Sequence, residues 1–200
     1  MGSRPYSILL VFCTCISIQG CVPVIVGGVA TGAAVAQDSR TTGTVVDDEA
    51  IELKAGHAIR RDEELRRRTH INFTSYNNIV LVSGEAPTEE LKKRVIELTR
   101  KIPKVRQVED WIVIAAPSSL SSRSTDTLLT ASVKSKLLTI RDFDSTKIKV
   151  VTEKGGVFLM GLVTRREGEI ATEASRRVSG VQKVVPLFEY TDPAGKGRGA

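Results

Sequence analysis

Few side chains in this sequence could carry out chemistry. The chain has only two histidines, His57 and His70, and three cysteines among 200 residues. Neither histidine stands in a metal-ligand spacing such as H-E-x-x-H, and no G-x-S-x-G nucleophile motif occurs. The acid pairs Asp47–Asp48 and Glu89–Glu90 stand where helices are expected to begin, a position in which carboxylates interact favourably with the helix dipole. The sequence therefore predicts no enzyme active site, no metal site and no cofactor.

The cysteine chemistry that the sequence favours is lipid attachment. An apolar run, Ile8–Ile18, follows Arg4 and is too short to span a membrane, but it has the length of a signal-peptide core. It ends in I-Q-G-C at 18–21, which resembles the cleavage site of bacterial lipoproteins. We expect residues 1–20 to be a signal peptide and Cys21 to carry diacylglycerol on its thiol and a third chain, such as palmitate, on its amine. An ordinary signal peptide with a chance cysteine is the alternative.

The residues after Cys21 predict where the anchored protein resides. Cys13 and Cys15 lie in the segment expected to be removed, so the mature chain keeps no thiol for a disulfide or a metal. Residue 22 is Val rather than the Asp that resembles an inner-membrane retention signal, so we expect the outer membrane, on its periplasmic face. Residues 21–45, rich in Gly, Ala, Val and Thr, are predicted to be a flexible tether, with a frayed helix over 29–36 as the alternative.

The rest of the chain contains an internal repeat. Residues 71–84 superpose on 148–161 at an offset of 77, and the similarity continues at an offset of 76 from the pair Thr88 and Thr164. Two copies are too few for a solenoid, so we expect two small domains. Their predicted bounds are 46–115 and 125–191, with a Pro/Ser-rich linker at 116–124 and a disordered tail at 192–200.

Each copy is predicted to fold as helix, strand, strand, helix, strand. Asp47 or Asp48 is expected to begin the first helix of the first copy, and Thr125 or Asp126 that of the second. Asn77–Asn78 predicts a tight turn, because asparagine tolerates positive φ. The implied fold class is α+β, with two helices packed on one face of a three-stranded sheet in each domain. The predicted strands are 71–76, 79–84, 105–114, 148–153, 157–161 and 181–190.

Two short motifs identify a family. The pattern V-x-L-x-G occurs at 80–84 and at 157–161, and G-V-x-x-V occurs at 180–184. With the order of the predicted elements, these motifs resemble BON domains, and a lipoprotein signal followed by two such domains resembles a class of outer-membrane lipoproteins. The resemblance implies a non-enzymatic protein that supports outer-membrane integrity and binds anionic phospholipid through its second BON domain.

The first helix of the second copy has apolar residues on two opposed sides. Leu129, Val133 and Leu137 form one stripe, which predicts the core face. The first copy offers Ala50, Leu53, His57 and Arg60 at the positions that match the outer side. We therefore expect only the second helix to be apolar on both sides. Its outer face supplies the candidate phospholipid-binding residues: Leu128, Ala131, Lys134, Ser135 and Leu138.

Two alternatives to lipid binding remain for that outer face. It could pack against the first domain, or it could dock on a protein of an envelope assembly or division complex. Relatives of this type place Trp where Leu128 stands, and Trp suits the membrane interface better than Leu. The leucine would therefore weaken lipid affinity in this chain or shift it toward Leu138 and Phe143. Lys136 and Arg141 would add positive charge beside the face.

The net charge of +6 separates unevenly between the two copies. Residues 47–114 hold 13 basic and 13 acidic groups, whereas residues 126–190 hold 11 and 8, a net charge of +3. With aromatic content of 4% and an export signal, nucleic acid is a poor expectation. Trp111, the single tryptophan, is expected in the core or between the domains.

Overall fold

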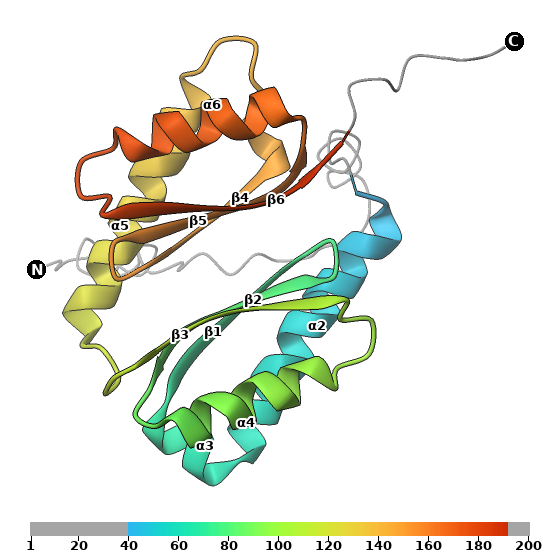
Figure 1. Ribbon diagram of the computed structural model, residues 1–200, viewed down its shortest axis with the longest axis vertical. Helices are drawn as coiled ribbons and strands as arrows, with labels where there is room; N and C mark the ends of the chain where they lie inside the picture. The colour runs from blue at the N-terminus through green and yellow to red at the C-terminus, as the bar shows by residue number, and fades with distance from the viewer. Residues whose placement is uncertain (1–39, 192–200) are drawn as a thin grey trace, which may run out of the picture. The chain divides into compact units, whose positions relative to one another are not determined.

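The computed structural model describes residues 40–191, which form two modules of the same architecture (Figure 1). The predicted signal peptide, Cys21 and the tail 192–200 lie outside the described residues. The first module consists of α2 (Thr42–Arg61), α3 (Glu63–Arg68), β1 (His70–Tyr76), β2 (Ile79–Ala86), α4 (Glu89–Arg100) and β3 (Gln107–Ile114). The second consists of α5 (Leu120–Leu138), the 3-10 turn η1 (Ser145–Lys147), β4 (Ile148–Glu153), β5 (Gly156–Val163), α6 (Arg165–Arg176) and β6 (Lys183–Tyr190).

Each module is a three-stranded sheet with helices on one face, as predicted (Figure 1). The central strand pairs antiparallel with the first strand and parallel with the third, because α4 or α6 carries the chain back across the sheet. One core lies under α2 and α4 around Val80 and Val95, and the other under α5 and α6 around Val157 and Ala171. The α+β fold class is confirmed, with the short α3 as an addition in the first module.

The opposite face of each sheet is covered by the other module. A third apolar cluster joins Tyr76 and Leu81 of the first module to Phe158 and Met160 of the second. Trp111 packs edge-on against Phe158, with ring centroids 5.2 Å apart. The expectation that Trp111 lies in the core or between the domains is therefore confirmed, and its place is between them.

Polar contacts surround this apolar cluster. Glu189 accepts hydrogen bonds from Asn77 at 2.6 Å and from Arg106 at 2.5 Å, and Lys149 donates to Glu52 at 2.8 Å. Each pair joins one module to the other. The sheet faces therefore meet as an apolar centre with a charged rim.

The first helix begins earlier than predicted. α2 starts at Thr42, where Thr41 caps it by accepting from the Thr44 amide, so residues 42–45 are helical and not part of a tether. No acidic residue lies in its first turn. Thr and Gly are weak helix formers, so propensity alone placed the start too late. The tertiary ion pair between Arg40 and Asp48, 2.6 Å apart, ties this first stretch down.

The linker prediction was also too long. α5 begins at Leu120, because Ser119 caps it by accepting from the Ser122 amide, and Arg123 donates to the carbonyl of Ser118 at 2.8 Å. Residues 120–124 are therefore helical, and neither Thr125 nor Asp126 is the N-cap. Serine favours caps as well as loops, which is why a serine-rich run was misread as linker.

Asp48 and Asp126 have a role that the helix-dipole interpretation missed. Both are buried within a helix and hold the hairpin turn of their own module. Asp48 accepts from the amides of Asn77 and Asn78 at 2.8 Å each, and Asp126 accepts from the amides of Lys154 and Gly155. Positive φ angles at Asn77, Asn78 and Lys154 aim these amides at the carboxylates. Helix and hairpin are thus locked together in both copies.

The glycine of the V-x-L-x-G motif lies where two strands approach closely. A Cβ at Gly84 would stand 2.0 Å from the His70 carbonyl oxygen, and one at Gly161 would stand 2.6 Å from the Lys147 carbonyl oxygen. Gly84 also has a φ of +118°. The motif therefore requires glycine for steric reasons.

A capping box at α6 predicts a loss of stability at acid pH. Thr164 and Glu167 cap each other, and Lys147 lies 3.0 Å from Glu167. Burial raises the pKa of Glu167, but contacts with Thr164 and Lys147 outweigh it and leave the pKa below its usual 4.5. Stability from this group is therefore complete above pH 4.5 and is lost as pH falls through the lower folded-state pKa.

The check is the unfolding free energy of the parent and of Glu167→Gln, measured by urea denaturation between neutral and acid pH. The variant is expected to be less stable at neutral pH by about 1 kcal/mol, with the gap closing on acidification. A gap that does not depend on pH would contradict this prediction.

Within residues 40–191, no helix combines the length and the hydropathy needed to cross a membrane.

Candidate membrane-binding face

α5 is held on the second module by the stripe that the sequence predicted. Leu129, Val133 and Leu137 are buried, with exposed fractions of 6%, 0% and 1%. Val133 and Leu137 pack in the core against the sheet beneath the helix, and Thr130 donates a hydrogen bond to Thr152 at 2.9 Å. The helix is therefore fixed in rotation, and its outer side is defined.

The outer side carries two exposed leucines. Leu128 is 70% exposed and Leu138 is 71% exposed. They lie about 15 Å apart along the axis, from ten residues at about 1.5 Å each. The other candidate residues, Ala131, Lys134 and Ser135, are exposed between them. Helical periodicity puts Ala131 and Ser135 on the side of the two leucines and Lys134 at its edge. We call the side formed by these five exposed residues the outer face of α5.

Positive charge accompanies these leucines. Lys134, Lys136 and Arg141 are exposed, and the segment 128–138 contains no acidic residue. Among the described residues, no carboxylate lies within ion-pair distance of these three cations. The outer face is therefore both apolar and cationic, a combination that suits an anionic surface.

Two hollows flank the outer face. One of about 530 Å³ lies beside Leu128, with Lys154, Gly155 and Gln182 in its walls. The other, of about 210 Å³, lies between Leu138, Lys134 and the first strand of the second sheet. Each of the two exposed leucines therefore lines one of these hollows.

Two details of the sequence interpretation were wrong. Phe143 is half-buried against the second core, so it does not belong to the outer face. α2 also exposes apolar side chains opposite its core face, since Val46 and Leu53 are each 61% exposed. Charge still separates the two helices, because the segment 46–53 contains four acidic residues and no basic one. Apolar exposure alone does not distinguish α5; apolar exposure with positive charge does.

Comparison with known protein families is consistent with this architecture. The BON domain matches twice, over residues 47–116 and 125–192. The chain belongs to the BON domain family. Each match covers one of the two modules, and the two BON domains are joined by a short segment that is partly the start of α5.

The curated relatives are also of similar length. The chain is 37% identical over 177 residues to the outer membrane lipoprotein DolP of Haemophilus influenzae, which covers 88% of this chain and 92% of that protein. It is 33% identical to a 21 kDa hemolysin of Actinobacillus pleuropneumoniae, covering 76% and 79%. It is 26% identical to the osmotically-inducible protein Y of Escherichia coli, covering 78% and 87%. Like the Haemophilus influenzae relative, this chain is a lipid-anchored outer-membrane protein, and it contains two BON domains.

Proposed function

We propose that the protein binds anionic phospholipid through the outer face of α5, and that this binding supports the integrity of the outer membrane without a catalysed reaction. The observation that carries the proposal is a pair of exposed leucines on a rotationally fixed helix, beside cations that form no ion pair within residues 40–191. Lipid chains on Cys21 would hold the protein at the membrane, and α5 would bind anionic lipids in preference to neutral ones.

The energetics fit a reversible contact. A fully buried leucine contributes about 1.5–3 kcal/mol, and each lysine near an anionic surface contributes about 1 kcal/mol. Leu128 and Leu138 insert only their side chains, since α5 remains attached to its sheet. Because the lipid anchor keeps the protein at the membrane, α5 needs only modest affinity to select among lipids.

The test is co-sedimentation with vesicles of a chain that begins at residue 22 and so lacks the lipid anchor. All three apolar clusters lie within residues 40–191, so this chain keeps every one of them. We expect binding to phosphatidylcholine vesicles that contain phosphatidylglycerol and little binding to phosphatidylcholine alone. Binding should weaken in about 1 M salt, where charges are screened beyond about 3 Å.

Variants place the contact on the helix. Leu128→Glu or Leu138→Glu is expected to lower vesicle binding by about tenfold or more, since about 1.4 kcal/mol corresponds to tenfold. Leu53→Glu is the matched control, because Leu53 is a similarly exposed leucine on α2. Circular dichroism should stay unchanged in all three. Full binding by both α5 variants would refute the lipid site, and capture of one stoichiometric envelope protein without vesicle binding would favour a protein-docking role instead.

A further inference from the structure

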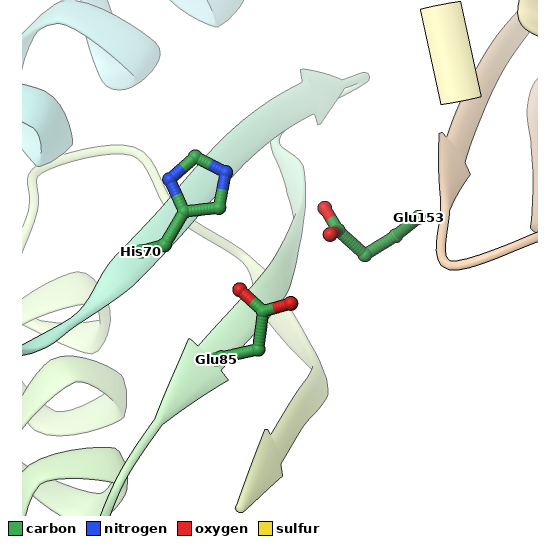
Figure 2. Close-up of side chains that lie close together, drawn as sticks. All are labelled: His70, Glu85 and Glu153. Atoms are coloured by element: carbon green, nitrogen blue, oxygen red, sulfur yellow. The ribbon is translucent and has the colours of Figure 1, made fainter. Parts of the chain in front are cut away.

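Three ligand-type side chains converge where the two modules meet, away from α5's outer face. His70 and Glu85 are directly opposite one another on β1 and β2, and Glu153 ends β4 in the other module. One nitrogen or oxygen atom of each lies within 4.8 Å of the others. Figure 2 shows the imidazole and both carboxylates directed toward a common centre. Sequence spacing could not reveal this cluster, because its members come from two modules.

The burial of Glu85 is the strongest evidence that this cluster is a binding site rather than a chance grouping of surface residues. Glu85 is fully buried, at 0% exposure, and neither carboxylate oxygen accepts a hydrogen bond of good geometry. Lys154 Nζ lies 3.0 Å from Oε1 as an ion pair. A buried carboxylate that accepts no well-formed hydrogen bond and has an ion-pair partner at only one oxygen is a costly arrangement, which a further cation would relieve.

Glu153 brings a second carboxylate to the cluster from the other module, where it is half-buried. Asn72 holds one carboxylate oxygen, Oε2, with a hydrogen bond of 3.0 Å. Two carboxylates that repel each other across a module boundary are the arrangement that a divalent ion neutralises.

There is also space beside the cluster. A cavity of about 240 Å³ is lined by His70, Asn72, Arg123, Asp126, Thr130 and Glu153. His70 is half-buried at the edge of this cavity, where a neutral imidazole would offer a nitrogen lone pair to an ion. Such a cavity accommodates an ion together with coordinated water.

We propose that His70, Glu85 and Glu153 bind a divalent transition-metal ion of the zinc type, which clamps the two BON domains together. One imidazole nitrogen and two carboxylate oxygens suit zinc, with water as the fourth ligand. Magnesium and calcium are disfavoured because they prefer oxygen ligands alone. Ligand atoms about 2.1 Å from zinc stand roughly 3.4 Å apart in a tetrahedron, so the half-buried His70 and Glu153 side chains must close by about 1 Å.

Lys154 competes with this ion. Its ammonium group forms an ion pair with Glu85, but its side chain is long, flexible and 36% exposed. Metal binding would displace the ammonium toward solvent. Loss of a metal ligand should therefore weaken metal binding, whereas loss of Lys154 should strengthen it.

The test is isothermal titration of zinc chloride into the chain from residue 22, purified without a histidine tag. This chain contains no cysteine, so thiol binding cannot contribute. We expect one equivalent of zinc to bind and to raise Tm, because a ligand of the native state stabilises it. Magnesium and calcium chloride should give neither effect. Absence of saturable binding at one equivalent, or equal binding of magnesium, would overturn the proposal.

Matched variants locate the site. His70→Asn and Glu153→Gln should each weaken zinc binding by about 100-fold or more, since loss of outer-sphere contacts alone costs about 10–100-fold. His57→Asn removes the other histidine, which is exposed on α2, and should leave zinc binding unchanged. Lys154→Met should tighten zinc binding. Zinc binding that survives His70→Asn, or that falls equally in His57→Asn, would overturn the assignment. These zinc-binding measurements are independent of vesicle binding by α5, so the metal site and the lipid site can fail separately.

Discussion

Replacement of Gly84 by alanine is expected to lower the free energy of unfolding by about 3–5 kcal/mol. Two costs combine at this position. The backbone has a φ of +118°, which L-residues rarely adopt, and the new Cβ would stand 2.0 Å from the His70 carbonyl oxygen. That oxygen belongs to the neighbouring strand, so relief requires β1 to move away from β2. The measurement is urea denaturation followed by circular dichroism.

Two other glycines serve as references for this prediction. Gly161→Ala should cost less, about 1–3 kcal/mol, because its Cβ would stand 2.6 Å from a backbone oxygen and no positive φ adds strain. Gly56→Ala should be neutral or stabilising by up to about 1 kcal/mol, because Gly56 lies within α2 and its Cβ would meet only the flexible end of Arg60. Equal effects at Gly84 and Gly56 would show that the close strand contact does not govern stability.

Asp48→Ala is expected to cost about 3–5 kcal/mol, the range for removing one partner of a buried charged network. Asp48 is 2% exposed and pairs with Arg40. It also accepts hydrogen bonds from the Ser75 hydroxyl at 2.6 Å and from the amides of Asn77 and Asn78. Alanine would remove the acceptor for all of them at once and release α2 from the β1–β2 hairpin. Urea denaturation with Trp111 fluorescence measures the loss.

The neighbouring acid supplies a matched control. Asp47 pairs with Lys104 at the surface, so Asp47→Ala should change the unfolding free energy by less than about 1 kcal/mol. Asp126→Ala, the equivalent change in the second BON domain, should fall between the two. Asp126 accepts two amide hydrogen bonds, but within residues 40–191 it forms no ion pair like that of Asp48 with Arg40. If Asp47→Ala and Asp48→Ala cost the same, the turn-locking role of Asp48 would be wrong.

The elements that sequence predicted well are those with strong local signals. Thr88 and Thr164, a matched pair in the repeat, cap α4 and α6, and Asn77–Asn78 forms the predicted turn with φ of 51° and 64°. A capping hydroxyl and a turn asparagine act on amides two or three residues away, so their effect is visible in a short window. The helix starts were harder, because Thr42 and Leu120 follow residues that favour caps and loops equally.

In the candidate lipid site, too, the features with a local sequence signal were predicted and those that depend on neighbouring elements were not. The spacing of Leu129, Val133 and Leu137 determined which side of α5 is buried, and therefore that Leu128 and Leu138 face outward. The exclusion of Phe143 and the exposure of Val46 depended on which residues the neighbouring elements cover. Periodicity describes one helix, whereas coverage depends on what packs against it.

By itself, the sequence determined the repeat, the α+β class and the BON family, because the pattern of apolar residues, turn residues and motif glycines recurs in each copy. Only the tertiary structure decided that the two sheets pack against each other through Leu81 and Phe158, that Asp48 and Asp126 lock the hairpins, and that His70, Glu85 and Glu153 meet. The physical reason is distance along the chain. Local hydrogen-bonding and hydrophobic periodicity act within a few residues, whereas these contacts join residues that come together only when the chain has folded.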